Sequence, residues 1–382
     1  MTKKIIFLFA TPVLEGDELK YSLNTLIEYG FQILIYDLTS YVAPDIERCV
    51  TKKRIHKDYI EYNIITTHNE LINAIRDNCK DGFFFPMFDD YYQVKEVYRM
   101  FTKYDARFGY VNNLVYDLDV GSSGKLSNIL KKLSIDKINS IIYNRVLRKV
   151  YRYKNAEFVA FGSILSRKQI SERCRIDKNT TKIFTHTFDF QRFNDTLKYD
   201  NNGTQYCVFL DQYIPYHPDN IFDRGLKIDA KKYYNEICSL LDLVSKKFGL
   251  SIIIAAHPRA DYSNKKVFPK SYKVISGKTS ELIKGAKLVL AHFSTAIGFA
   301  VLAKVPLSIL LPHAFSNITE FDNNCRTFAD VLGCEIIEDS DDIKKIDLNF
   351  DYDKYVAFTE KYMTCILNNC ETNLWDPVIK HI

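Results

Sequence analysis

The sequence lacks the patterns that mark several common classes of protein. It contains nine cysteines, but none stands in a CxxC pair or in another spacing typical of metal ligands. No apolar run approaches the roughly 18–20 residues that a membrane-spanning helix needs. An odd, scattered set of cysteines in a chain of 382 residues predicts reduced thiols rather than a disulfide framework. We therefore expect a cytoplasmic protein whose contact with the inner face of the cytoplasmic membrane, if any, is peripheral.

The sequence also lacks a large excess of charge of either sign. The formal net charge is +5, with 26% charged and 47% hydrophobic residues. This is the composition of a globular protein, and it lacks the excess of positive charge that nucleic-acid-binding proteins commonly carry. The basic segment 145–154 fits a solvated helix face better than a contact with anionic lipid or an acidic glycan. No nucleic-acid partner is expected.

The amino-terminal segment lacks both a signal-peptide cleavage site and a glycine-rich dinucleotide motif. The short run in MTKKIIFLFATPVLEGDE meets acidic residues without the small-residue cleavage site of a signal peptide. We expect a strand over residues 3–10, a helix over residues 16–29 and a second strand over residues 31–37. Since the first turn lacks the GxGxxG glycines, this β-α-β opening is not expected to bind a dinucleotide.

Strand and helix signals alternate through the rest of the chain, which predicts an α/β fold of doubly wound, Rossmann-like domains. The length favours two domains, since domains commonly contain about 100–200 residues. The polar, turn-rich segment 199–204 is the best boundary between them. We expect one domain over residues 1–197, a second over residues 204–350, and a terminal helix over residues 351–382 that packs back on the first domain.

Polar residues follow three apolar strands of the second domain. They are Asp211 and Gln212; His257, Pro258 and Arg259; and Ser294 and Thr295. Pro258 has no N–H for a strand ladder, so its strand should end at His257. Ligands of open α/β sheets bind outside the carboxyl ends of the strands. Hydroxyls and amides at the start of a helix, joined by an imidazole from another strand end, would form a phosphate pocket there.

Each of these residues also has a structural explanation. In the structural explanation, Ser294 or Thr295 caps a helix. His257 is then a structural histidine whose hydrogen bonds are satisfied within the protein, and Asp211 forms a turn. His217, in a second His-Pro pair, is then a loop residue. The topological rule favours the functional interpretation, because all three strand ends should face one crevice.

The order of these motifs is similar to that of a known family. An acidic loop, a strand that ends in His-Pro and a Ser-Thr turn before a helix resemble the bacterial sialyltransferases and related Kdo transferases of the GT-B fold. His257-Pro258 and Ser294-Thr295 match the short motifs closely. The stretch FLDQYIPYHPD is similar to surface-polysaccharide proteins of O-antigen and capsule gene clusters. The resemblance implies two Rossmann-like domains that face a central cleft, the first for the acceptor and the second for the nucleotide-sugar donor.

The resemblance also implies roles for individual residues. His257 would contact the donor phosphate and act as general acid for the departing CMP, while Ser294 and Thr295 bind that phosphate. The family's base lies in a loop of two acids followed by glycine, and this chain departs from that pattern with Asp-Leu-Asp-Val-Gly over residues 117–121. Asp119 is the preferred base. The alternative bases are Asp89 and Asp90.

Asp211 offers a different mechanism, as a nucleophile that forms a glycosyl-enzyme intermediate like those thought to form in some retaining Kdo transferases. Inversion with Asp119 as base and retention through Asp211 predict different anomers. Both mechanisms remain open from the sequence.

The donor is indicated by a second absence. GT-B enzymes that use UDP-sugars usually place a glutamate on the helix after the phosphate turn, yet residues 295–311 contain no carboxylate. This favours a CMP-activated donor. No metal is expected, because HxxE and DxD-type spacings are missing apart from Asp117 and Asp119.

We therefore expect a glycosyltransferase that moves a nonulosonic acid or Kdo-type sugar from CMP to a glycan or glycolipid acceptor in bacterial capsule or lipopolysaccharide biosynthesis. Two alternatives remain. One is an epimerase or hydrolase of the UDP-GlcNAc 2-epimerase type, and the other is a non-catalytic carbohydrate-binding protein on the same scaffold.

Overall fold

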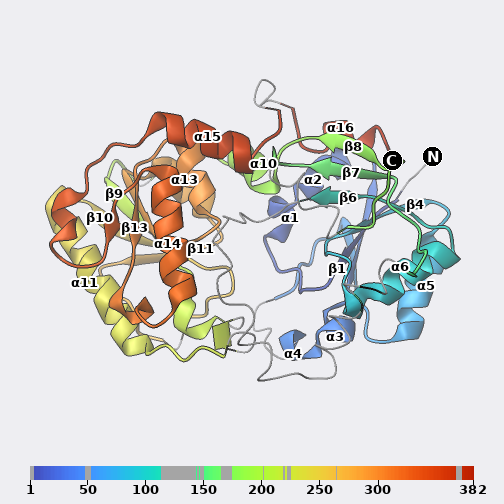
Figure 1. Cartoon of the computed structure of the whole chain (residues 1–382), viewed down its shortest axis with the longest axis horizontal. Coiled ribbons are helices and arrows are strands. Elements are labelled where there is room, and N and C mark those ends of the chain that lie inside the picture. The colour runs from blue at the N-terminus through green and yellow to red at the C-terminus, as the bar shows by residue number, and fades with distance from the viewer. Residues whose placement is uncertain are drawn as a thin grey trace. The chain divides into compact units, whose positions relative to one another are not determined.

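The structure is a computed structural model of the chain (Figure 1). The residues it describes are 4–47, 53–112, 143, 146, 150–164, 174–200, 202–217, 220–221, 225–263, 265–366 and 372–382. They divide into two compact units. The first unit contains the described residues up to Phe188 and those from Thr364 onward, and the second contains those from Asp189 to Met363. Asp117 and Asp119 lie outside the described residues.

The first unit is built on parallel strands. A five-stranded sheet has the order β3-β2-β1-β4-β5, and a three-stranded sheet has the order β6-β7-β8. The strands are β1 (Lys4–Phe9), β2 (Gln32–Asp37), β3 (Ile60–Ile64), β4 (Gly82–Pro86), β5 (Arg107–Phe108), β6 (Tyr110–Asn112), β7 (Phe158–Phe161) and β8 (Thr181–Phe184). β1 and β4 are almost wholly buried, as expected for parallel strands that are covered on both faces.

The helices of the first unit follow the strands in alternation. They are α1 (Asp17–Lys20), α2 (Leu23–Glu28), α3 (Thr39–Val42), α4 (Pro44–Glu47), α5 (His68–Asn78), α6 (Lys95–Lys103) and α16 (Asp376–Ile379), with the short η1 (Tyr92–Val94) before α6. The prediction of a single helix over residues 16–29 is wrong. Ser22 has a left-handed backbone with φ of 48°, which interrupts the helix and divides it into α1 and α2.

The carboxyl-terminal segment completes the first unit. Cys365 donates its backbone N–H to the carbonyl oxygen of Thr185 (3.1 Å), and the Thr185 hydroxyl donates to the carbonyl oxygen of Leu374 (2.8 Å). The Trp375 ring is fully buried, with its centroid 5.9 Å from that of Phe7 and 5.5 Å from that of Phe85. This segment therefore contributes to the same core as the central strands.

The second unit contains one six-stranded parallel sheet in the order β11-β10-β9-β12-β13-β14. The strands are β9 (Tyr206–Leu210), β10 (Ser251–Ala256), β11 (Lys273–Ser276), β12 (Leu288–Ala291), β13 (Leu307–Leu310) and β14 (Ile336–Ile337). Counted along the chain, this is the order 3-2-1-4-5-6 of the doubly wound Rossmann fold. The first unit's larger sheet follows the same order for its five strands.

Helices pack on the faces of this second sheet (Figure 1). They are α11 (Ala230–Phe248), α12 (Thr279–Gly285), α13 (Ile297–Ala303), α14 (Thr319–Leu332) and α15 (Tyr352–Tyr362), with the short turns η3 (Ile214–Tyr216), η5 (His313–Phe315) and η6 (Asp342–Lys345); α10 (Phe188–Asp195) spans the change of unit. The Asp229 side chain caps α11 by accepting the Lys232 N–H (3.0 Å), and Gly249 ends the helix with φ of 65°. Capping at both ends fixes the connection between β9 and β10.

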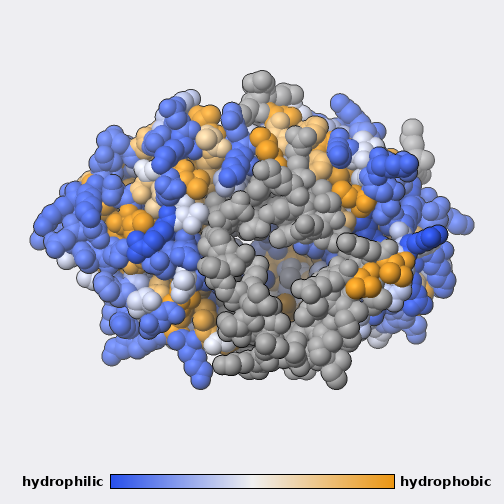
Figure 2. All heavy atoms as spheres, in the orientation of Figure 1, coloured by the Kyte–Doolittle hydropathy of each residue, from blue (hydrophilic) through white to orange (hydrophobic). Residues whose placement is uncertain are grey.

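On the face shown in Figure 2, the described residues are mostly hydrophilic, with smaller apolar patches between them. Within the described ranges, no helix is both long and apolar enough to cross a membrane.

Removal of the Trp375 ring should destabilise the first unit. We expect Trp375→Ala to lower the free energy of unfolding of this unit by about 3–5 kcal/mol, because loss of the large buried side chain leaves a cavity against Phe7 of β1 and Phe85 of β4. Urea unfolding followed by circular dichroism measures this loss. Leu19→Ala is the matched control, since Leu19 is 50% exposed in the same unit and its loss should change stability by less than about 0.5 kcal/mol. Equal stability of the two variants would contradict the assigned core.

Candidate functional site

The candidate residues of the second unit lie at one edge of its sheet. β9 pairs with β10 on one side and with β12 on the other, all in parallel. Asp211, His257 and the turn that contains Ser294 follow the carboxyl ends of these strands. Neighbouring strands are about 4.8 Å apart, so the two outer strand ends are separated by about 10 Å, with the end of β9 between them. This is the topological switch point of the sheet, where α/β proteins bind their ligands.

Asp211 holds the turn that follows β10. Its carboxylate accepts hydrogen bonds from the Tyr262 hydroxyl (2.6 Å), from the Tyr213 backbone N–H (3.0 Å) and from the backbone N–H of His257. Only 4% of the residue is exposed, and burial raises the pKa of Asp211 while these hydrogen bonds act in the opposite direction. Its backbone N–H also donates to the carbonyl oxygen of Ala255 (3.1 Å). One buried carboxylate thus fixes both ends of the segment from His257 to Tyr262.

Gln212 holds the turn that follows β12. Its side-chain oxygen Oε1 accepts a hydrogen bond from the backbone N–H of Phe293 (3.1 Å). Asp211 and Gln212 are consecutive, yet their side chains bond to opposite neighbours of β9. The end of the central strand therefore sets the positions of both flanking turns.

The contacts of His257 define its tautomer. The backbone N–H of Arg259 donates to His257 Nδ1 (3.1 Å), so Nδ1 accepts and the hydrogen of the neutral ring lies on Nε2. The Ala260 N–H donates to the His257 carbonyl oxygen (2.8 Å), which closes the turn around Pro258. The imidazole is partly buried, whereas Pro258 is exposed. His257 can therefore offer an Nε2–H donor without any change in its backbone.

Ser294 and Thr295 behave differently from each other. The Ser294 hydroxyl accepts a hydrogen bond from the Ala296 N–H (3.2 Å), and its carbonyl oxygen accepts from the Ile297 N–H (3.1 Å). Ser294 therefore stabilises the turn before α13, whereas the N-cap position of that helix is Ala296 and has no side-chain cap hydrogen bond. The side chain of Thr295 is exposed, and α13 begins two residues after it, at Ile297.

Two consecutive tyrosines of α11 form hydrogen bonds with residues that follow β10 and β12. Tyr233 shares a hydrogen bond of 2.8 Å with His292 Nε2, and Tyr234 shares one of 3.1 Å with the Tyr262 hydroxyl. His292 Nδ1 contacts the carbonyl oxygen of Leu310 at 2.6 Å, so Nδ1 carries the hydrogen and Nε2 accepts from Tyr233. Burial lowers the pKa of His292 to about 4, which keeps the ring neutral. His292 thereby attaches the end of β12 to β13.

Sequence reasoning missed Tyr262, Tyr234 and His292. His292 stands directly after the apolar strand, in LAHFST, and a histidine at a strand end was a usable signal. Tyr262 lies 51 residues from Asp211 in the chain, and nothing in the sequence pairs the two. The contact follows only from the order of the strands.

The alternative bases, Asp89 and Asp90, belong to the first unit. Asp90 is buried and forms an ion pair with Arg175 (Nε to Oδ2, 2.9 Å), and its other oxygen accepts from the Tyr143 hydroxyl (2.9 Å). Asp89 is partly buried. Across the described part of the chain, no group of three or more His, Cys, Asp or Glu side chains could hold a metal ion.

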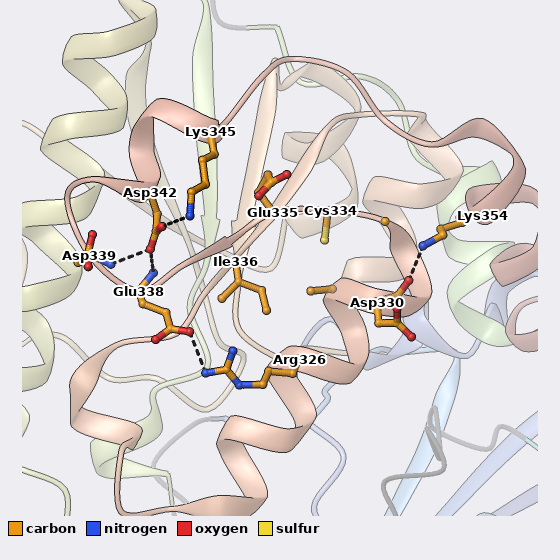
Figure 3. Close-up of a pocket in the computed structure, with 12 residues that line it drawn as sticks. Arg326, Asp330, Cys334, Glu335, Ile336, Glu338, Asp339, Asp342, Lys345 and Lys354 are labelled. Carbon is orange, nitrogen blue, oxygen red and sulfur yellow. Dashed lines mark hydrogen bonds and ion pairs between the residues drawn. The ribbon is translucent and has the colours of Figure 1, made fainter.

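A cavity of about 680 Å³ lies in the second unit, between the end of α14 and β14 (Figure 3). Four of its charged side chains form two ion pairs: Lys345 Nζ lies 2.6 Å from Asp342 Oδ1, and Arg326 lies 2.8 Å from Glu338 Oε1. β14 is the edge strand of the sheet and is separated from β9 by β12 and β13, so this cavity is not at the strand ends that carry Asp211 and His257. It belongs to a different part of the sheet.

Comparison with known proteins shows the fold. No protein-family model matches the sequence, and no curated protein matches it. The wall teichoic acid polymerase TagF matches 99% of this chain and 88% of its own at 14% identity, with a TM-score of 0.55. UDP-GlcNAc 2-epimerase from Methanocaldococcus jannaschii matches 92% of this chain and 95% of its own at 14% identity, with a TM-score of 0.49. The calicheamicin glycosyltransferase CalG4 matches 90% and 88% at 11% identity, with a TM-score of 0.47.

The likeness to TagF, together with the two sheets, confirms the α/β fold of GT-B type with Rossmann-like sheets that we expected. Identities this low say nothing further about activity. The resemblance to sialyltransferases and Kdo transferases in particular stays a prediction.

The buried His292 should make stability depend on pH. The unfolded histidine takes up a proton near its ordinary pKa of 6.5, but the folded one does so only near 4. Between these values the unfolded state binds more protons, so His292 lowers the free energy of unfolding as the pH falls, by about 3 kcal/mol in total. Urea unfolding at several pH values from 7 to 4 measures this loss.

The control variant is His292→Gln, whose amide retains a donor and an acceptor but does not titrate. We expect it to be less stable than the wild type at pH 7 and the difference to shrink as the pH approaches 4. A difference that stays constant over this range would contradict the assigned neutral, buried histidine.

Proposed function

We propose that the chain is a glycosyltransferase that transfers a nonulosonic acid or Kdo-type sugar from a CMP-activated donor to a glycan or glycolipid acceptor in bacterial surface-polysaccharide biosynthesis. One observation carries the proposal. Asp211 and Gln212 hold the His257 turn and the Phe293 turn on either side of β9, at the switch point of a Rossmann sheet. Such an arrangement presents an imidazole and a hydroxyl turn to the same ligand.

The phosphate of CMP is the group that these residues would recognise. The Nε2–H of His257 and the exposed hydroxyl of Thr295 are donors at the two turns that flank the end of β9. As the bond between the sugar and the phosphate breaks, negative charge builds on the departing phosphate, and donors that are already in place stabilise it. A monophosphate can be neutralised in this way by an imidazole and hydroxyls, so the proposal needs no metal ion.

The tautomer of His257 refines its expected role. Proton release from Nε2 as a general acid requires the imidazolium, whose Nδ1–H would face the Arg259 N–H that now donates to Nδ1. The observed turn therefore supports His257 as a hydrogen-bond donor to the leaving phosphate. The general-acid role remains a prediction, and it requires the contact with Arg259 to open.

The acids have separate places in the proposal. Asp119 remains the preferred base that takes the proton of the acceptor hydroxyl. The carboxylate of Asp211 is buried and bonded to Tyr262, Tyr213 and His257, which supports a positioning role. Its use as a nucleophile is the retained alternative, and the variants described below distinguish the two roles.

The helix after the phosphate turn supports CMP rather than UDP. α13 has the sequence IGFAVLA and offers no carboxylate for the ribose hydroxyls of a UDP-sugar. A UDP-GlcNAc 2-epimerase type of activity would require such a group near this turn. The absence therefore favours the CMP-dependent transferase over that alternative.

Nucleotide binding tests the donor. At a concentration of about 100 times its dissociation constant, CMP should raise the free energy of unfolding by about 2.7 kcal/mol, which appears as a higher melting temperature. CDP, UDP and GDP at the same concentration should give smaller shifts. A shift with UDP but not with CMP would overturn the donor assignment.

Substitutions at the strand ends test the site. With CMP-sialic acid or CMP-Kdo as donor, His257→Ala should reduce the rate of CMP release by about 100- to 10,000-fold. Asp211→Asn should weaken CMP affinity and lower the rate together, because the amide cannot accept from all three donors and the His257 turn shifts.

The two roles of Asp211 give different results. If it is the nucleophile, Asp211→Asn keeps the wild-type affinity for CMP and loses turnover alone. A non-catalytic carbohydrate-binding protein would show no CMP release in the wild type and no loss of function in His257→Ala.

A further inference from the structure

A second imidazole lies against His257. The ring centroids of His217 and His257 are 4.9 Å apart, and the ring planes are inclined by 75°. His217 follows η3 in the loop after β9, while His257 follows β10, so the two rings come from neighbouring strand ends of one sheet. Both side chains are partly buried. His217, interpreted from the sequence as an ordinary loop residue, therefore lies beside His257.

The loop that carries His217 is held in place by hydrogen bonds. The carbonyl oxygen of His217 accepts hydrogen bonds from the backbone N–H groups of Asn220 (3.0 Å) and Ile221 (3.2 Å). The buried Asn220 side chain donates to the carbonyl oxygen of Ile214 (2.9 Å), and Tyr213, which enters this turn with φ of 54°, is bonded to Asp211. The carboxylate that positions His257 therefore also anchors the loop of His217.

The positively charged side chain of Lys265 lies next to this loop. Lys265 Nζ is 5.1 Å from the centroid of the Tyr216 ring and 5.6 Å from that of Tyr213. It also donates to the carbonyl oxygen of Asp261 (3.2 Å). The positive charge of Lys265 would attract an anionic group to the end of the sheet at which the imidazoles lie. The surroundings of His217 thus fit a phosphate better than a neutral sugar.

We propose that His217 binds the same donor phosphate as His257, so that the site contains a pair of imidazoles. The proposal rests on the proposed function, because it specifies how that site holds its nucleotide. Two rings with centroids 4.9 Å apart can donate to different oxygens of one phosphate, since each N–H···O contact spans about 2.9 Å. The competing explanation is that His217 only packs against the His257 ring.

Two substitutions separate binding from packing. His217→Phe keeps an aromatic ring against His257 but has no nitrogen, whereas His217→Gln keeps a hydrogen-bond donor. We expect His217→Phe to weaken CMP binding by about 10- to 100-fold, the loss that accompanies a missing hydrogen bond to a charged group, and His217→Gln to restore part of it. Isothermal titration calorimetry of the full chain with CMP measures these affinities.

Cytidine is the ligand control. It lacks the phosphate, so its affinity should be equal in the wild type and in His217→Phe. His381→Phe is the matched protein control, because His381 is an exposed histidine of the first unit whose ring touches Phe158 at the start of β7. It should bind CMP as the wild type does. The melting temperature of each variant confirms that it is folded.

Each outcome decides between the proposals. If His217→Phe binds CMP as tightly as the wild type while His257→Ala does not, His217 only packs and this inference is overturned, but the proposed function stands. If His217→Phe weakens CMP and cytidine equally, the loss arises from the fold of the loop, which also overturns the inference. If the wild type binds no CMP, or if His257→Ala binds it normally, the proposed function fails and the phosphate role of His217 fails with it.

Discussion

The hydrogen bonds of the buried Asp211 carboxylate are the constraint on which the candidate site depends. A carboxylate with 4% exposure is costly to bury unless its oxygens have partners. Here the partners are the Tyr262 hydroxyl and two backbone N–H groups, those of Tyr213 and His257. Because each donor comes from a different part of the loops, satisfying one side chain brings those loops together. Loss of any donor would leave the carboxylate partly unsatisfied, which couples the shape of the site to the stability of the unit.

Further side-chain hydrogen bonds hold the turns after β10 and β12. Gln212 bonds to the turn after β12, while Asp211 bonds to the turn after β10. On α11, the consecutive residues Tyr233 and Tyr234 repeat this division, one on His292 and the other on Tyr262. Two pairs of adjacent residues thus hold the two flanking turns from the strand side and from the helix side. These contacts fix the turns that carry His257 and Thr295.

The predictable parts of the fold were those encoded in local patterns. β10 was predicted because its residues are continuously apolar up to the His-Pro pair, and that pattern needs no distant partner. The break at Ser22 could not be predicted, because the left-handed backbone there is not favoured by serine and depends on the packing around it. The start of α13 at Ile297 also depends on local contacts, since Ser294 bonds to Ala296 in a turn that precedes the helix.

For the site, the residue types were predictable but their partners were not. That Asp211, Gln212 and His257 belong to one edge followed from the rule for parallel sheets. That β9 lies between β10 and β12 did not, and this order decides which side chain reaches which turn. The contacts of Asp211 with Tyr262 and of Gln212 with Phe293 join residues that are 51 and 81 positions apart. A sequence alone therefore identified Asp211 as a candidate for chemistry, whereas its hydrogen bonds support a positioning role.

Positioning of this kind has a direct consequence for binding. A ligand that orders a loose loop loses part of its binding free energy to the lost conformational freedom of that loop. The segment from His257 to Tyr262 is held by Asp211 at both ends, and the contact of His257 Nδ1 with Arg259 already selects the Nε2–H tautomer. The imidazole therefore needs little reorganisation to meet an anion. The same argument extends to His217, because Tyr213, at the start of its loop, donates to the same carboxylate. A single buried acid thus organises two imidazoles, which explains why it is placed at the end of the central strand rather than at an outer one.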